Sequence, residues 1–263
     1  MTNKQKILNA LKNKNLVKII SGIQNYDKQK TLNVAMAAEM GGANALDICD
    51  ETEIIKTIRA AVQVPLFVSS IDPEKLINAQ ELGADVLEIG NFESFYNSGK
   101  MFTPKEILDI TKKVKKLLRK DILLCCTIPA TLEIKNQIKL AKELVELGVD
   151  ILQTEGFALN TPASDRKDST YTDILKSAST LTNTIELRKA LPNANIITAS
   201  GISNTTAPLA IAMGASGVGV GHYINSLLSQ VEMTERVNEL VESVSQISNS
   251  KTMQIEKQLA FKM

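Results

Sequence analysis

The sequence predicts an α/β fold, a single (β/α)8 barrel of the TIM-barrel class, from three observations. Short β-branched segments alternate with amphipathic segments along the chain, as they do in repeated strand–helix units. Four of the amphipathic segments end in the same glycine signature, in register with this repeat. The length of 263 residues also matches the roughly 250 residues that such a barrel uses as one domain.

Eight segments are predicted to be the strands, since each is a short apolar or β-branched run that follows a turn. They begin at residues 16, 45, 65, 85, 122, 150, 195 and 216 and read LVKIIS, ALDIC, PLFVSS, DVLEIG, ILLCCTI, DILQTEG, NIITASG and SGVGVG. Closure of the barrel requires GVGVG of the last strand to pair with VKIIS of the first. An open doubly wound sheet is the alternative, but no G-x-G-x-x-G turn follows the first strand.

A helical pattern follows each predicted strand. The segment TPKEILDITKKVKKLLRK has apolar residues at spacings of three and four, with Thr103 as its N-cap and Pro104 as its first helical residue. MGGAN, LGAD, LGVD and MGAS place a glycine where a left-handed residue ends a helix. The barrel is predicted to occupy residues 1–244, and residues 245–263 are predicted to be a C-terminal tail or extra helix.

Charge and composition limit the classes of function. The 30 basic and 29 acidic residues nearly cancel, so the chain lacks the basic surface that general nucleic-acid binding requires. No apolar segment reaches the roughly 20 residues needed to cross a bilayer, and the start MTNKQKILNALKNKN lacks a secretory signal, so membrane insertion is not expected. Cys49, Cys125 and Cys126 have no metal-ligand spacing and are expected to be reduced core residues, so no metal site is predicted.

Two glycine turns near the end of the sequence predict an anion site. ASGIS follows the seventh strand, and GVGVGHYIN is the eighth strand with the start of its helix, so both leave backbone N–H groups exposed at a helix start. In such barrels the loops after strands seven and eight frequently bind phosphate. The predicted binding residues are Ser200, Gly201, Gly219 and Gly221. The alternative is that these glycines only allow tight turns and close helix packing.

Six segments, in order from Lys18 to Asn225, resemble one known family. KIISGIQNYD, GGANALDIC, VLEIGNFESFY, ILQTEG, TASGIS and GASGVGVGHYIN are similar to the hypothetical chloroplast reading frame 23 family of plastids and cyanobacteria. The resemblance implies a phosphate-binding TIM barrel in the plastid stroma or in a cyanobacterial cytoplasm, and it supplies no reaction. The segment FALNTPASDRKDSTYTD, after the sixth strand, is longer and more polar than the Gly- and Ser-rich turn associated with this family.

Polar residues interrupt the predicted strands at five positions: Lys18, Asp47, Glu88, Gln153 and Glu155. Branched apolar side chains fill the interior of such barrels, so an inward charge has to be paired or functional. Period-two alternation places Gln153 and Glu155 on one face of their strand, and Glu88 opposite its two apolar neighbours. A catalytic group and a buried ion-pair network both fit this pattern.

The predicted function is that of an enzyme that binds a phosphorylated small molecule, such as a sugar phosphate, and acts on it by acid–base or Schiff-base chemistry. Glu88 or Glu155 would act as general acid or base with Asp47 as partner, or a desolvated Lys18 would form a Schiff base in a lyase or aldolase. A non-catalytic ligand sensor or assembly partner is a further alternative, and a homo-oligomer stays open. The predicted substrate contacts are Gln153 and Asn91.

The segment NFESFYNSGKMF after the fourth strand contributes an aromatic cluster: Phe92, Phe95, Tyr96 and Phe102. It is predicted either to line the pocket of a flat ligand or to cover the barrel rim or a subunit contact. The first alternative would suit FMN, whose phosphate would bind at the two glycine turns. His222, the one histidine, stands at the start of the last helix, so a catalytic triad has little support.

Overall fold

The computed structural model describes residues 1–96, 98–157 and 169–260, and within them eight parallel strands close into a barrel. Closure is made by the pairing of the last strand with the first, in which Leu16 lies opposite Gly217 and Ile19 opposite Val220. This confirms the predicted TIM barrel and excludes the open sheet. The strands, paired in chain order, are β1 (Leu16–Ile20), β2 (Ala45–Cys49), β3 (Leu66–Ser70), β4 (Val86–Ile89), β5 (Leu123–Ile128), β6 (Ile151–Thr154), β7 (Asn195–Ala199) and β8 (Gly217–Val220).

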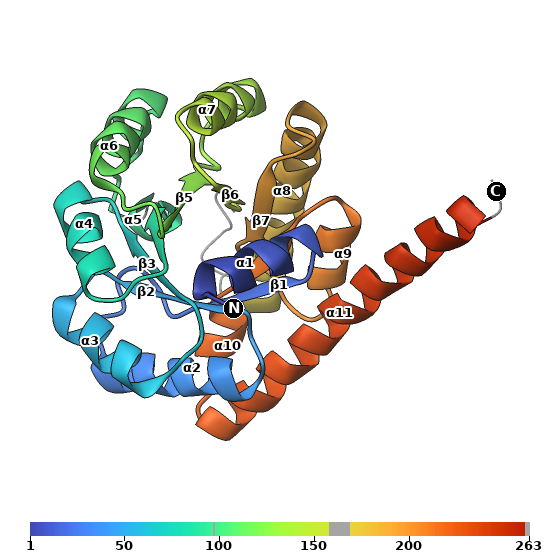
Figure 1. Ribbon diagram of the computed structural model, residues 1–263, viewed down its shortest axis with the longest axis horizontal. Coiled ribbons are helices and arrows are strands. Elements are labelled where there is room, and N and C mark those ends of the chain that lie inside the picture. Colours follow the sequence, from blue (N-terminus) through green and yellow to red (C-terminus); the bar gives the residue numbers. More distant parts are fainter. Residues whose placement is uncertain (97, 158–168, 261–263) are drawn as a thin grey trace.

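Helices form a ring around this barrel (Figure 1). The ring helices follow successive strands and are α2 (Lys28–Met40), α3 (Thr52–Ala61), α4 (Pro73–Glu81), α6 (Pro104–Leu117), α7 (Ile134–Glu146), α8 (Ser169–Ala190), α9 (Ala207–Ala212) and α11 (Gln230–Ala260). Two short helices, α5 (Glu93–Tyr96) and α10 (His222–Asn225), lie in the loops after β4 and β8. Helix α6 begins as predicted, because the Thr103 hydroxyl accepts a hydrogen bond from the N–H of Glu106 and Pro104 is the first helical residue.

Four turns from helix to strand depend on glycine. Gly42, Gly83, Gly148 and Gly214 have φ angles of 81°, 97°, 83° and 111°. Residues with a Cβ rarely adopt this left-handed backbone, whereas glycine adopts it without steric cost. The repeated glycine signature therefore ends α2, α4, α7 and α9 and directs the chain into the next strand.

Alternation along the strands divides the core in two. Outward side chains such as Leu87 and Cys126 pack against the surrounding helices, while inward ones such as Phe67 and Cys125 form a separate cluster inside the barrel. Cys49, Cys125 and Cys126 are all buried and have free thiols. Adjacent Cys125 and Cys126 therefore face opposite sides of the sheet, as expected for neighbours in a strand.

An additional helix, α1 (Asn3–Lys12), precedes the first strand and was not predicted. Its buried residues Ile7, Ala10 and Leu11 belong to the inner cluster, together with residues at the amino-terminal ends of the strands such as Leu16. Figure 1 shows α1 lying across the centre of the ring. Helix α1 therefore closes the bottom of the barrel with its apolar face.

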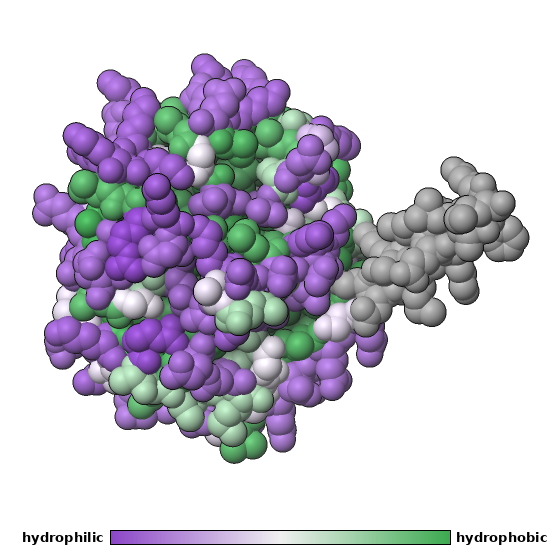
Figure 2. All heavy atoms as spheres, in the orientation of Figure 1, coloured by the Kyte–Doolittle hydropathy of each residue, from purple (hydrophilic) through white to green (hydrophobic). Residues whose placement is uncertain are grey.

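The last helix, α11, packs on the outside of the ring against α2 and α9. Its side chains Val237 and Val244 are buried, and a Cβ added at Gly41 would lie only 2.6 Å from Val237. Residue 244, the predicted end of the barrel domain, falls inside this helix. Figure 2 shows hydrophilic residues over much of the visible face, with smaller hydrophobic areas between them. No helix in the described parts of the chain has the length and apolarity to span a membrane.

Candidate functional site

Three charged side chains meet inside the barrel, above the apolar bottom. Lys18 of β1, Asp47 of β2 and Glu88 of β4 are each at most 1% exposed. The Lys18 ammonium forms an ion pair with the Glu88 carboxylate, and its Nζ lies 3.3 Å from Asp47 Oδ2. Since β1 and β4 are not neighbours in the sheet, the Lys18–Glu88 pair spans the barrel interior. We refer to Lys18, Asp47 and Glu88 as the ion group.

Burial and charge act together on the protonation of the ion group. Burial lowers the pKa of Lys18, but the nearby carboxylates of Asp47 and Glu88 outweigh it, so this pKa lies above its ordinary value. Burial raises the pKa of Glu88, Lys18 opposes that rise and Asp47 adds to it. A Schiff base requires a neutral amine, whereas Lys18 is held as an ammonium ion. This arrangement favours an ion-pair network over the Schiff-base alternative.

Two amide side chains separate the ion group from the solvent side of the barrel. Asn91 Nδ2 donates to Asp47 Oδ2 at 3.1 Å, and Gln153 Nε2 donates to Glu88 Oε1 at 2.6 Å. The amides also contact each other, because Gln153 Nε2 lies 3.0 Å from Asn91 Oδ1. Gln153 and Asn91 line a cavity above them, and the ion group does not contribute to its described lining. The two predicted substrate contacts therefore form the floor of a cavity.

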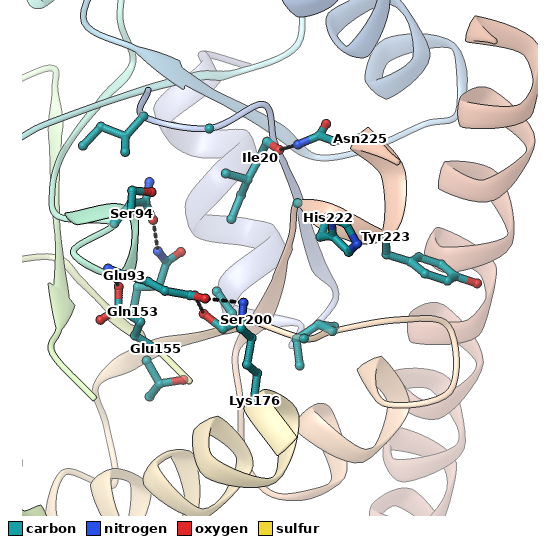
Figure 3. A pocket seen from close by; sticks show the side chains of 18 residues that line it. Ile20, Glu93, Ser94, Gln153, Glu155, Lys176, Ser200, His222, Tyr223 and Asn225 are labelled. Carbon is teal, nitrogen blue, oxygen red and sulfur yellow. Dashed lines mark hydrogen bonds and ion pairs between the residues drawn. The ribbon is translucent and has the colours of Figure 1, made fainter. Parts of the chain in front are cut away.

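This cavity, of about 370 Å³, lies at the carboxyl-terminal ends of the strands. The loops after β1, β4, β6, β7 and β8 form its wall together with α8. Ligands of such barrels bind at this end. Figure 3 shows Ser200 and Lys176 between two opposite groups of labelled residues: Glu93, Gln153 and Glu155 on one side, and His222, Tyr223 and Asn225 on the other.

Glu155 lines the cavity and stands apart from the ion group. Its Oε1 accepts a hydrogen bond from the backbone N–H of Glu93 at 2.5 Å, and its Oε2 accepts one from the Tyr96 hydroxyl at 2.6 Å. Burial raises the pKa of Glu155 to about 8, while the Tyr96 hydrogen bond opposes this rise and the charge of Glu93 adds to it. Glu155 is thus a carboxyl group on the cavity wall that changes protonation close to neutral pH.

Two charged residues of the cavity wall were not predicted. Glu93 begins α5, Lys176 lies on α8, and their charged atoms are 2.5 Å apart. The Ser200 hydroxyl also donates to Glu93 Oε2, at 2.8 Å. Glu93 and Lys176 are far apart in the sequence, in the loop after β4 and on α8, so no sequence pattern indicates that they share a site. The available signal was an acidic residue within the aromatic segment directly after the fourth strand.

Three of the four predicted anion-binding residues reach the cavity. Ser200 and Gly201 have left-handed φ angles of 74° and 66°, and they line the cavity together with Gly221. Gly221 is followed by α10, whose first backbone N–H groups, at His222 and Tyr223, have no partner within that helix. The loops after β7 and β8 therefore converge on one part of the cavity wall.

Gly219 occupies a different place from the other three. It lies within β8, opposite Lys18 of β1 and Ala199 of β7, and does not belong to the described cavity lining. An added Cβ would lie 3.0 Å from Ile20 Cδ1 and 3.3 Å from Gln153 Oε1. Any side chain at residue 219 would therefore crowd Ile20 and the Gln153 amide, and the Gly219 N–H belongs to the strand rather than to a turn.

The aromatic segment after β4 packs into the core. Phe92 and Phe102 are buried, with ring centroids 4.5 Å apart, and Tyr96 directs its hydroxyl to Glu155. Phe92, Phe95, Tyr96 and Phe102 are not among the described residues that line the cavity. They therefore do not provide the aromatic wall expected for the ring of FMN.

Two further sequence expectations concern a metal site and the polar segment after β6. The described residues contain no group of three His, Cys, Asp or Glu side chains suited to a metal ion. Residues 158–168, which form most of FALNTPASDRKDSTYTD, lie outside the described residues.

Solved structures with known names share the barrel fold. Thiamine phosphate pyrophosphorylase from Pyrococcus furiosus superposes with a TM-score of 0.60 at 16% identity, covering 90% of this chain and 98% of that one. A 3-hexulose-6-phosphate synthase superposes with a TM-score of 0.59 at 13% identity, covering 87% of this chain and 99% of that one. At such identities the likeness concerns the fold alone.

Sequence relatives give a closer match. "Uncharacterized protein ycf23" of Pyropia yezoensis is 38% identical over 240 residues, which cover 91% of this chain and 86% of the relative. The protein of the same name from Porphyra purpurea is 36% identical over 251 residues, covering 95% and 92%. The family described as "Protein of unknown function (DUF561)" matches residues 1–250. The chain therefore belongs to the DUF561 family and is a relative of the ycf23 proteins, in agreement with its resemblance to hypothetical chloroplast reading frame 23.

Proposed function

We propose that this protein is an enzyme that binds a phosphorylated small molecule at the carboxyl-terminal end of the barrel and performs acid–base chemistry on it. The observation that carries the proposal is Glu155, a buried carboxyl group on the cavity wall whose pKa is raised to about 8. A general acid or base works best when its pKa lies near the working pH, because it can then both give and take a proton.

The phosphate group would bind at the loops after β7 and β8. Ser200 and Gly201, with left-handed backbone, and Gly221, before α10, line the cavity there. Consecutive N–H groups in such turns form concave sites for anions. The names of two proteins with the same fold, thiamine phosphate pyrophosphorylase and 3-hexulose-6-phosphate synthase, include phosphate compounds and so support this choice.

The remaining site residues take different roles in this proposal. Gln153 and Asn91 contact the substrate from the floor, and the ion group beneath them holds these amides in place. Glu88 and Asp47 therefore position the Gln153 and Asn91 amides and do not contact the reacting atoms. The ycf23 relatives from Porphyra and Pyropia support a plastid protein, and we extend this to the plastid stroma or the cytoplasm of a cyanobacterium.

Solvent-deuterium exchange tests the acid–base chemistry before the substrate is known. The protein is incubated in deuterium oxide with a mixture of phosphorylated sugars and acids, and mass spectrometry measures deuterium in the recovered compounds. The wild-type protein is expected to exchange a carbon-bound hydrogen of at least one compound. Glu155→Gln is expected to exchange it at least roughly a hundredfold more slowly, the lower range for losing a general acid or base.

A matched control separates the role of this carboxylate from a general effect of lost charge. Glu53 lies on α3, its side chain is 69% exposed, and it does not line the cavity. Glu53→Gln is therefore expected to exchange at the wild-type rate. Two results would contradict an enzyme of this kind and favour a non-catalytic ligand sensor. Wild type and Glu155→Gln could exchange deuterium at equal rates, or no compound that the protein binds could show exchange.

A further inference from the structure

A buried oxygen at the cavity floor has no hydrogen-bond donor. Gln153 is 1% exposed and lines the cavity. Within the part of the chain that the structure describes, its Oε1 accepts no hydrogen bond. Buried polar groups are nearly always paired, and leaving one without a partner costs free energy. This oxygen therefore indicates a ligand group that completes the floor.

The orientation of the Gln153 amide follows from its other contacts. Nε2 donates to Glu88 Oε1 at 2.6 Å and to Asn91 Oδ1 at 3.0 Å, and it lies 3.3 Å from Thr127 Oγ1. Because Lys18 holds Glu88 in an ion pair, its carboxylate accepts hydrogen bonds and requires the NH₂ side of the amide to face it. Oε1 consequently faces away from Glu88, on the side where Gly219 of β8 lies.

We propose that Gln153 Oε1 accepts a hydrogen bond from a hydroxyl group of the phosphorylated ligand, so that the substrate is a phosphorylated hydroxy compound. This inference rests on the proposed function and adds the group that the floor recognises. A hydroxyl group satisfies an amide oxygen without bringing a charge into the buried floor, where Glu88 is already paired with Lys18. Gln153 is then a specificity-determining residue, and Glu88 and Lys18 are positioning residues.

Glu155 is well placed to act on such a ligand. Figure 3 shows Glu155 on the same side of the cavity as Gln153, and both belong to the segment at the end of β6. A ligand held by Ser200, Gly201 and Gly221 at its phosphate would reach from those loops to the floor. Its hydroxyl-bearing carbon would then approach the carboxyl group that takes or gives the proton.

Matched pairs of probes measure the preference for a hydroxyl group. Alkyl phosphates from ethyl to pentyl are compared with their ω-hydroxy counterparts, which differ only in the terminal hydroxyl, and calorimetric titration gives each Kd. With the wild-type protein, the hydroxy compound is expected to bind about tenfold more tightly at the chain length that reaches the floor. An alkyl end would leave Oε1 unpaired, which is the physical reason for this difference.

Two variants remove the preference by different means. Gln153→Met deletes the acceptor at similar side-chain length, and the two probes are then expected to bind within about twofold of each other. Gly219→Ala keeps Gln153 but adds a Cβ at 3.3 Å from its Oε1, so it is also expected to reduce the preference. If Gln153→Met does not fold, as circular dichroism would show, the Gly219→Ala result decides.

The chain offers a matched control in Gln137. It is 3% exposed, its Oε1 likewise has no donor in the described residues, and it lies on α7 away from the cavity. Gln137→Met is expected to leave the hydroxyl preference unchanged, because Gln137 does not line the cavity and cannot contact the ligand.

The outcomes separate this inference from the function on which it rests. Two results would overturn the hydroxyl assignment while leaving phosphate binding intact. The wild-type protein could bind both members of every probe pair with equal Kd, or the preference for the hydroxy compound could persist in Gln153→Met. Failure of inorganic phosphate and of every probe to bind would overturn the phosphate site itself, and the hydroxyl assignment with it.

Discussion

Replacement of Glu155 with glutamine is expected to change how stability depends on pH. Burial raises the pKa of Glu155 from 4.5 to about 8, with an opposing hydrogen bond from Tyr96. A carboxyl group with a raised pKa binds its proton more tightly in the folded state, so its contribution to stability is complete below about pH 4.5 and is lost as the pH rises through about 8. Glutamine stays neutral, and its amide can donate to Tyr96 while its oxygen accepts from the N–H of Glu93.

The size of this effect follows from the rise in pKa. At about 1.36 kcal/mol per pKa unit, a rise from 4.5 to about 8 corresponds to at most about 5 kcal/mol of unfolding free energy. Urea unfolding of both proteins between about pH 5 and about pH 8 measures it, because other titrating groups cancel in the difference. The wild-type protein is expected to lose stability relative to Glu155→Gln across this range. Parallel pH profiles would show that Glu155 does not titrate near neutral pH.

Three further predictions concern the phosphate site, the ion group and the barrel bottom. Gly221→Val is expected to abolish the binding of inorganic phosphate in calorimetry, because its side chain would block the approach of the anion to the backbone. The circular dichroism is expected to stay unchanged, because φ is −112° and the nearest neighbour of an added Cβ is 3.5 Å away. Unchanged phosphate affinity would contradict the site. Lys18→Met is expected to lower the free energy of unfolding in urea by about 3–5 kcal/mol, because it leaves the carboxylates of the ion group buried without their cation. A decrease below about 1 kcal/mol would argue against this pairing. Leu11→Ala is expected to cost about 2–5 kcal/mol, and no loss would show that α1 does not close the barrel bottom.

The barrel could be predicted because each strand–helix unit is encoded locally. The eight predicted strands begin at the observed first residue or one residue before it, since short β-branched runs and glycine turns mark these positions. Helix α1 was missed although Ile7, Ala10 and Leu11 have helical spacing and Thr2 forms a capping box with Gln5. Its packing depends on the apolar opening of a closed barrel, which no local pattern reveals.

The candidate site could be predicted in part, from polar residues within regular strands and from the two glycine turns. Lys18, Asp47 and Glu88 each lie within a strand and meet inside the barrel, whereas alternation alone left open which face of each strand points inward. Strand β6 ends at Thr154, so alternation no longer determines where the Glu155 side chain points. The environment of Glu155 depends on the α5 segment, which lies about sixty residues away in the chain and brings the Glu93 N–H and the Tyr96 hydroxyl.

Binding of phosphate by the loops after β7 and β8 can be measured through the amide chemical shifts of the ¹⁵N-labelled protein. Titration with inorganic phosphate is expected to shift the amide signals of Gly201, Gly221 and His222 together, with a single Kd, because their N–H groups would contact the anion. Gly99, in the turn after α5, lies outside the cavity lining and serves as an internal control. Unchanged signals at Gly201, Gly221 and His222, or equal shifts at Gly99, would show that these loops do not bind phosphate.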